Sequence, residues 1–209
     1  MWVVLEFMEG GTLTEAVKTS RFRESEVSYV AREMFVGLAH MHEHRVIHRD
    51  LKSANVMLTV KAEIKLIDFG LCGDARHSPY LKGMVGSPYW MPPEMIRGQP
   101  HSYPVDTWSA GVCLLELCNG QAPKMGNAFK SMFYTGSGQV PPLKKPDQWS
   151  MTMQDFFAKM LEIEQSKRAT PEELLAHDFL KSNVASRADM RKKLTEIFQA
   201  GAIVNAGFG

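Results

Sequence analysis

The stretch His44–Gly70, HRVIHRDLKSANVMLTVKAEIKLIDFG, differs in character from the mostly helical chain around it. Its short apolar runs are separated by polar turns and predict three short strands, at 46–47, 56–60 and 64–67. Its polar positions include Asp50, Asn55 and Asp68, and residues of these types favour turns. They also supply the oxygen atoms that hard cations prefer. Turn chemistry explains any one of the three, whereas three at a fixed spacing indicate a functional site.

The spacing of these polar residues fits two motifs. Residues 48–55, HRDLKSAN, match the pattern H-R-D-L-x-x-x-N at every fixed position. Eighteen residues after Asp50, Asp68-Phe69-Gly70 matches D-F-G. Together, and in this order, they make the chain resemble the eukaryotic protein kinases. The resemblance covers about residues 1–182 and includes three further matches downstream: Pro92-Pro93-Glu94, Asp106 to Gly111, and Arg168.

The resemblance implies a mainly α fold, α+β overall. This is the protein-kinase-like C-lobe, helical with short β hairpins around the catalytic loop, plus one remaining N-lobe strand and the hinge. It implies three regions: the last N-lobe strand and hinge over 1–9, the C-lobe over 10–182, and a tail over 183–209. The periodicity of apolar residues predicts helices over 25–42, 150–164 and 187–199, and a stretch that is apolar nearly all round predicts a buried helix over 106–119. We expect the last of these to pack on its own domain.

Composition excludes several classes of protein. The chain of 209 residues is 44% hydrophobic and 22% charged, which is typical of a soluble globular protein. A net charge of +1 gives no field that attracts nucleic acid or a membrane surface, so we expect neither as a partner. No run approaches the ~18 apolar residues of a transmembrane helix. Three cysteines without metal-site spacing indicate reduced thiols and a cytoplasmic location.

The resemblance assigns roles in phosphoryl transfer from ATP to a protein. Asp50 would accept or orient the proton of the attacking hydroxyl, and Lys52 would place its ammonium near the γ-phosphate. Asp68 and Asn55 would each hold Mg²⁺ through a side-chain oxygen. A lysine at position 52 is typical of serine/threonine kinases rather than tyrosine kinases. The expected substrate is therefore a protein serine or threonine.

Other matched residues would support this centre. His48 would support the loop rather than act as a base. Arg49 would either pair with a phosphate on the activation loop or form a plain salt bridge, and the sequence leaves both open. The remaining supporting positions are Phe69 and Gly70 of D-F-G, Asp106 as a brace for the catalytic-loop backbone, and Glu94 with Arg168 as a buried ion pair.

Residues 87–90, Ser-Pro-Tyr-Trp, resemble the loop that receives the substrate residue. Ser87 and Pro88 would contribute to it, with the hydroxyl of Ser87 directed toward Asp50 and Lys52. This platform favours a peptide substrate over the small-molecule phosphotransferases that share the fold.

The opening run is apolar at five of the six positions 2–7, and Gly10-Gly11 follows it. Such a run predicts a strand buried on both faces that ends at the two glycines. In kinases a strand here leads into the hinge that holds adenine. The adenine contacts would be Leu5 as gatekeeper, Glu6 and Met8 in the hinge, and Met57 as the floor. Core packing explains Leu5 and Met57 equally well.

The 209 residues contain no G-x-G-x-x-G loop, no V-A-I-K lysine and no helix glutamate to pair with it. Two explanations compete. We favour a piece of a longer active kinase, whose N-lobe would be a partner in cis. The alternative is a truncated kinase-like module that binds, scaffolds or acts as a decoy without catalysing.

Two segments, WVVLEFMEGGTLTEAV and MVGSPYWMPPE, most resemble the PAK branch of serine/threonine kinases. Regulation by a small GTPase follows only by analogy with that branch. The branch places a phosphorylatable threonine where this chain has Gly83, so we expect no regulation through that position. Ser78 and Tyr80 are the nearby hydroxyls that remain for phosphopeptide mapping to examine.

Overall fold

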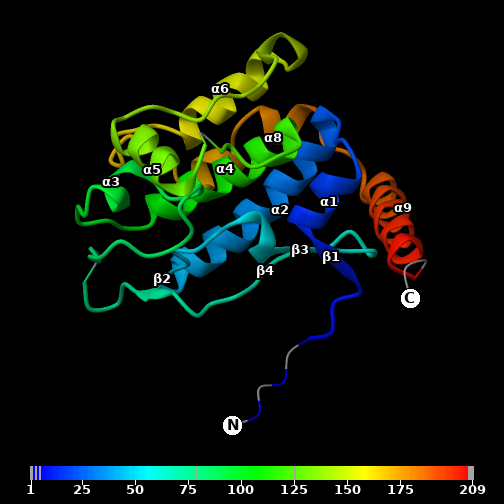
Figure 1. Ribbon diagram of the computed structural model, residues 1–209, viewed down its shortest axis with the longest axis horizontal. Helices are drawn as coiled ribbons and strands as arrows, with labels where there is room; N and C mark the ends of the chain where they lie inside the picture. The colour runs from blue at the N-terminus through cyan, green and yellow to red at the C-terminus, as the bar shows by residue number, and fades with distance from the viewer. Residues whose placement is uncertain (1, 3, 5, 79, 125, 207–209) are drawn as a thin grey trace.

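The computed structural model describes the whole chain except residues 1, 3, 5, 79, 125 and 207–209. Figure 1 shows the helices gathered in one body, with the short strands along one side of it. The helices are α1 (Leu13–Thr19), α2 (Glu24–Glu43), α3 (Pro93–Ile96), α4 (Pro104–Asn119), α5 (Ala128–Gly136), α6 (Met151–Met160), α7 (Pro171–Leu175), α8 (Phe179–Ser182) and α9 (Arg187–Ala206). The strands are β1 (Gly10–Thr12), β2 (Val46–Ile47), β3 (Val56–Thr59), β4 (Ile64–Leu66) and β5 (Gly73–Asp74). Single 3₁₀ turns are η1 (Ser53–Asn55) and η2 (Pro146–Gln148). The expected mainly α architecture with short hairpins is confirmed.

Helices α2 and α4 form the centre of the core. The apolar stripe of α2 is buried because its residues recur at intervals of three and four. Helix α4 is buried nearly all round, since every residue from Val105 to Leu117 is buried. It begins at Pro104, two residues before the predicted start, because proline suits the first turn of a helix. The two helices pack against each other, and α2 also contacts α7, α8 and β4.

The sheets bring the two motifs together. Strands β1, β3 and β4 form one antiparallel sheet in that order, and β2 pairs with β5 in another. Val56, which begins β3, lies opposite Leu66, which ends β4. The segment before β3 and the segment after β4 therefore leave the sheet at the same end. These two segments carry the H-R-D-L-x-x-x-N and D-F-G motifs.

The predicted strand over the opening run is wrong for the residues that the structure describes. Trp2, Val4 and Phe7 lie in no strand and are 97%, 94% and 89% exposed. A strand is stable only beside a partner, and the described part of this segment makes no ladder. Figure 1 shows the segment running away from the body. Leu5 lies outside the described residues.

The predicted break at the two glycines is also wrong, because Gly10 and Gly11 begin β1. The absence of a side chain is what allows this pairing. A β-carbon on Gly10 would collide with the carbonyl oxygen of Leu58 on β3, and one on Gly11 would collide with the ring of Phe198. Glycine here permits close approach rather than ending the strand.

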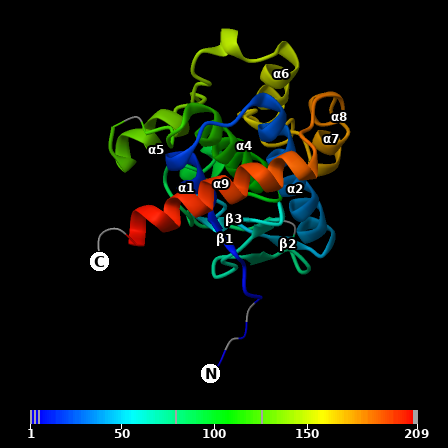
Figure 2. The same ribbon diagram turned by 90° about the vertical axis from the view of Figure 1, so that its right-hand side faces the viewer.

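The C-terminal helix α9 packs on its own domain, as expected, and extends beyond the predicted end. Figure 2 shows it lying across α1 and β1, and it contacts both. Its buried face includes Met190, Leu194 and Ile197. Among the described residues, no helix combines the length and the apolar character that crossing a bilayer requires.

The other differences are local. The helix predicted over 150–164 ends at Met160. In the turn that follows, the carbonyl of Glu162 accepts a hydrogen bond from the Arg168 side chain. Helix α5 was not predicted. Its apolar residues Phe129 and Phe133 are 76% and 70% exposed, and the side chains it buries are those of Ser131 and Thr135. All three cysteines are free, and burial raises the pKa of each thiol.

Candidate active site

The catalytic loop is held by one buried carboxylate. Asp106, in the first turn of α4, is fully buried. Its Oδ2 accepts from the backbone N–H of His48 at 2.8 Å, and its Oδ1 accepts from that of Arg49 at 2.9 Å. The His42 Nε2 bonds the same Oδ2 at 2.9 Å. Arg49 has φ of 64°, which is unusual for a non-glycine residue, and the carboxylate stabilises the turn that this conformation creates.

His48 connects the loop to the D-F-G segment. It is fully buried, and its Nε2 bonds the carbonyl of Ile67 at 3.0 Å. A carbonyl can only accept, so Nε2 carries the proton, and Nδ1 accepts from the N–H of Asp50 at 3.4 Å. Ile67 in turn donates its N–H to the carbonyl of Asn55 at 3.0 Å. Both backbone groups of Ile67 are thus hydrogen-bonded to the catalytic loop. These bonds fix the position of the next residue, Asp68. The geometry agrees with a supporting role for His48.

Three of the expected residues converge at Asp50, which is 8% exposed. The Lys52 Nζ lies 3.1 Å from its Oδ2, and the hydroxyl of Ser87 donates to its Oδ1 at 2.8 Å. The Asn55 Nδ2 donates to the Asp50 carbonyl at 2.9 Å. A carboxylate within hydrogen-bond distance of a hydroxyl has the geometry of a proton acceptor.

Gly86 lets the loop that contains Ser87 and Pro88 pack closely against the catalytic loop. Its φ is 104°, which non-glycine residues rarely adopt. A β-carbon there would also lie 2.5 Å from the carbonyl oxygen of Arg49 and 3.5 Å from the Asp50 Oδ1. The next residue, Ser87, is thereby held against Asp50. Pro88 follows in a turn closed by the Trp90 N–H on the Ser87 carbonyl at 3.0 Å.

Two side chains beside this centre fit a hard cation. Asn55 is 5% exposed and uses its Nδ2 as a donor, so Oδ1 is the amide's remaining acceptor. Asp68 is exposed and has φ of 64°, and its Oδ1 accepts from the Gly70 N–H at 3.4 Å. Carboxylate and amide oxygens are the ligands that Mg²⁺ takes in proteins. The donor set therefore fits Mg²⁺. Phe69, which is 55% exposed, places its ring 5.6 Å from that of His48.

Among the described residues, Arg49 forms no salt bridge with a carboxylate, and its pairing with a phosphate on the activation loop stays a prediction. Its Nε donates to the carbonyl of Leu71 at 2.8 Å, and its Nη2 reaches the carbonyl of Cys72 at 3.4 Å. The guanidinium of Arg49 thus connects the catalytic loop to the backbone just after D-F-G. Burial, followed by the charge of Asp106, raises the pKa of the Cys72 thiol to about 11. A thiol with a raised pKa is protonated at neutral pH.

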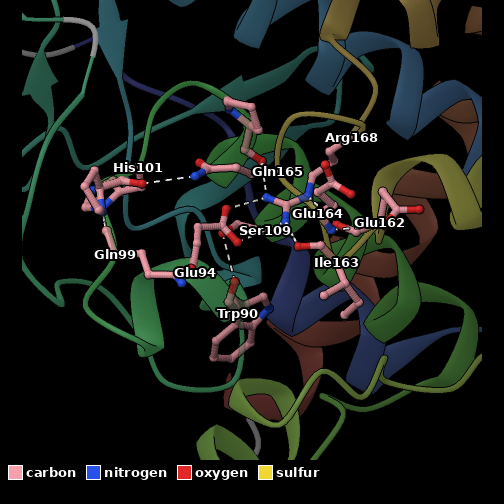
Figure 3. Close-up of polar contacts among 12 residues, drawn as sticks. Trp90, Glu94, Gln99, His101, Ser109, Glu162, Ile163, Glu164, Gln165 and Arg168 are labelled. Atoms are coloured by element: carbon pink, nitrogen blue, oxygen red, sulfur yellow. Dashed lines mark hydrogen bonds and ion pairs between the residues drawn. The ribbon is translucent and has the colours of Figure 1, made fainter.

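Glu94 and Arg168 form the expected ion pair, which Figure 3 shows. The two N–O distances are 2.6 and 3.0 Å, and each residue is 3% exposed. Arg168 also donates to the carbonyls of Pro104 at 3.0 Å and Glu162 at 2.8 Å. Its guanidinium carbon lies 5.1 Å from the ring centre of Trp108. The pair therefore joins the start of α3, the start of α4 and the turn after α6.

The expected adenine contacts are only partly placed. The side chain of Glu6 pairs with the Lys65 Nζ on β4, with N–O distances of 2.5 and 2.7 Å. Met8 is half-buried just before β1, and Met57 is half-buried on β3 opposite Thr12 and Lys65. Their roles stay predictions, and Leu5 is not among the described residues.

Sequence reasoning missed His42 and Ile67. The side chain of His42 is 8% exposed and bonds Asp106, yet it sits in the last turn of a helix with no motif to mark it. Ile67 acts through its backbone, so its side-chain type carries no signal. Only the fold reveals either contribution.

Replacing Asp106 by asparagine is expected to loosen the catalytic loop. The asparagine side chain has the shape of aspartate, but only its Oδ1 can accept a hydrogen bond. One of the two buried backbone N–H groups of the loop would then face the NH₂ group, which should lower the free energy of unfolding by about 1–3 kcal/mol. Denaturant unfolding and amide hydrogen exchange at His48 and Arg49 measure this. The exposed Asp178→Asn is the control and should match the wild type. Unchanged exchange in the Asp106 variant would contradict the bracing role.

Comparison with known proteins places this geometry in a family. The protein kinase domain model matches residues 1–180. The probable serine/threonine-protein kinase mkcB of Dictyostelium discoideum is 46% identical over 208 residues, which are 100% of this chain and 29% of that protein. The serine/threonine-protein kinase STE20 of Yarrowia lipolytica is 40% identical over 182 residues, 86% of this chain and 16% of its own. The serine/threonine-protein kinase shk1/pak1 of Schizosaccharomyces pombe is 35% identical over 186 residues, 88% of this chain and 28% of its own.

The chain thus spans less than a third of the length of each of these relatives. The match to mkcB continues past the end of the family model and includes the α9 segment. The loop held by Asp106, the carboxylate at Asp50 and these similarities lead to one conclusion: the chain belongs to the protein kinase domain family and is a serine/threonine-type member with PAK-branch kinases among its relatives.

Proposed function

We propose that the chain supplies the catalytic lobe of a serine/threonine protein kinase, which transfers the γ-phosphate of ATP to a protein hydroxyl. One observation carries this proposal. The carboxylate of Asp50 holds a hydroxyl at 2.8 Å and the ammonium of Lys52 at 3.1 Å simultaneously. A proton acceptor and a cation side by side are what phosphoryl transfer to a hydroxyl requires.

In this mechanism the substrate hydroxyl approaches Asp50, which orients it and accepts its proton. Lys52 offsets negative charge that spreads over the phosphoryl oxygens. Asp68 and Asn55 would hold Mg²⁺, which supplies charge neutralisation on the ATP phosphates when bound. Ser87 and Pro88 would position the peptide beside Asp50, since the loop is seated there by Gly86.

The proposed organisation follows from the same roles. Residues 1–9 would approach adenine as the hinge, residues 10–182 would form the catalytic lobe, and residues 183–209 would form the tail that packs behind it. An N-lobe in cis would complete the ATP site. The three free thiols fit a reducing compartment, so we assign the protein to the cytoplasm.

The test uses the full-length protein that contains this chain, γ-labelled ATP, and three peptides that differ only in a serine, threonine or tyrosine acceptor. We expect label on serine and threonine but not on tyrosine. Removing Mg²⁺ with a chelator should abolish transfer, and adding Mg²⁺ back should restore it. No incorporation on any peptide or general protein substrate would favour a non-catalytic binding module, and labelling of tyrosine would contradict the assignment.

A further inference from the structure

The C-terminal end of α2 and its capping residue His44 group three side chains that the proposed kinase chemistry does not use. His40, Glu43 and His44 occupy positions i, i+3 and i+4, which share one face of a helix. One potential ligand atom from each lies within 4.8 Å of the others, and all three residues are exposed. We propose that this turn binds a divalent transition-metal ion of the zinc class.

His44 is already oriented as a metal ligand. Its Nδ1 lies 2.8 Å from the carbonyl oxygen of His40, and because a carbonyl only accepts, Nδ1 must carry the proton. The lone pair is therefore on Nε2. Histidines that bind metals usually donate their other ring N–H to a carbonyl or carboxylate in this way, which fixes the tautomer and the ring direction. The ring of His40 is adjacent, with 4.3 Å between the ring centres.

The position on the helix favours a cation. The carbonyl end of a helix carries partial negative charge, and Glu43 adds a full negative charge beside both imidazoles. The helix that carries the ligands packs on the core through Phe35 and Leu38, which lie on its opposite face. His42, within the same turn, instead bonds the buried Asp106, so it belongs to the catalytic-loop brace and not to this cluster.

The donor set selects the class of ion. Two imidazoles and one carboxylate suit Zn²⁺ and its neighbours in the transition series, whereas Mg²⁺ prefers oxygen ligands alone. In a tetrahedral zinc site the ligand atoms lie about 3.4 Å apart. The side chains of His40 and Glu43 are exposed, so they are able to rotate toward that separation on binding. Water would complete the fourth position.

Titration of the full-length protein with Zn²⁺ by calorimetry, in buffer containing excess Mg²⁺, tests the proposal. Co²⁺ titration followed by visible absorption reports the ligand geometry independently. The variants are His40→Ala, Glu43→Gln and His40→Ala with His44→Ala, and His77→Ala is the control because it removes another exposed histidine. His40→Ala leaves the backbone carbonyl that accepts from His44, so the helix end stays capped.

We expect wild type and His77→Ala to bind one equivalent with the same affinity. His40→Ala should weaken Zn²⁺ binding at least about tenfold. Mutation of a residue that only hydrogen-bonds to a metal ligand already lowers metal affinity by about that factor. Glu43→Gln should weaken it in the same direction, and the double variant should lose the site. Equal Zn²⁺ affinity in the wild type and double variant would overturn the proposal, as would a loss caused by His77→Ala of the same size.

Discussion

The Asp50→Asn variant is expected to lose phosphoryl transfer by at least about a hundredfold while its fold remains intact. Asparagine has nearly the same shape as aspartate but cannot accept a proton. The attacking hydroxyl would therefore keep its proton. Its amide would also present N–H groups where the carboxylate now faces Lys52 at 3.1 Å and the Ser87 hydroxyl at 2.8 Å. At least one of these contacts would be lost.

Initial rates with saturating ATP and a serine peptide, measured on the full-length protein, check this expectation. Thermal unfolding of the same samples separates loss of chemistry from loss of structure. Asp147→Asn makes the same chemical change at an exposed position and should retain wild-type rates. Wild-type transfer by the Asp50 variant would remove the residue from the proposed mechanism.

Breaking the Glu94–Arg168 pair is expected to cost ~3–5 kcal/mol of unfolding free energy, because it leaves a buried charge without a partner. The two single variants should differ. In Glu94→Gln, Arg168 still donates to the carbonyls of Pro104 and Glu162. In Arg168→Leu, the carboxylate of Glu94 loses both of its guanidinium donors. Arg168→Leu should therefore be the more damaging change.

Urea unfolding of the two single variants and of the double variant measures the pair. The double variant should be more stable than Arg168→Leu alone, since it removes the stranded charge. The neighbouring pair of Lys167 and Glu164, at 2.6 Å, is exposed, and Lys167→Met should change stability little because solvent screens that contact. Equal midpoints for Arg168→Leu and Lys167→Met would show that burial of the ion pair contributes nothing.

Sequence patterns predicted the parts of this protein that depend on side-chain identity. The long helix over 25–42 was evident because its buried stripe recurs every three or four residues. The spacing of Thr170 and Glu173, three residues apart before an apolar run, predicts a capping box, and both of its hydrogen bonds are present at the start of α7. The residues around Asp50 were found through the spacing of their motifs, and the structure brings Lys52 and Ser87 to it.

What the sequence could not predict depends on partners or on the backbone. The apolar run at 2–7 has the composition of a strand, but a strand forms only with a neighbour. Helix α5 keeps Phe129 and Phe133 exposed and buries Ser131 and Thr135, so the side that packs is not the one that the apolar pattern marks. Ile67 acts through its backbone N–H and C=O groups. Every residue except proline has both groups, so the sequence does not mark this position. His42 gains its partner only when α4 packs beside α2.

The bond between Asp106 and the catalytic loop also has a consequence for how the chain acquires its shape during synthesis. The loop is separated from its anchor by 57 and 58 residues, so it leaves the ribosome well before the carboxylate that holds it. Helix α2 and the β3–β4 hairpin are local and can form early, whereas closing so long a segment is slow. We therefore expect the nascent polypeptide to acquire its helices first and the arrangement around Asp50 late. The arrangement around Asp50 therefore cannot be complete while the C-terminal half of the chain is still being made.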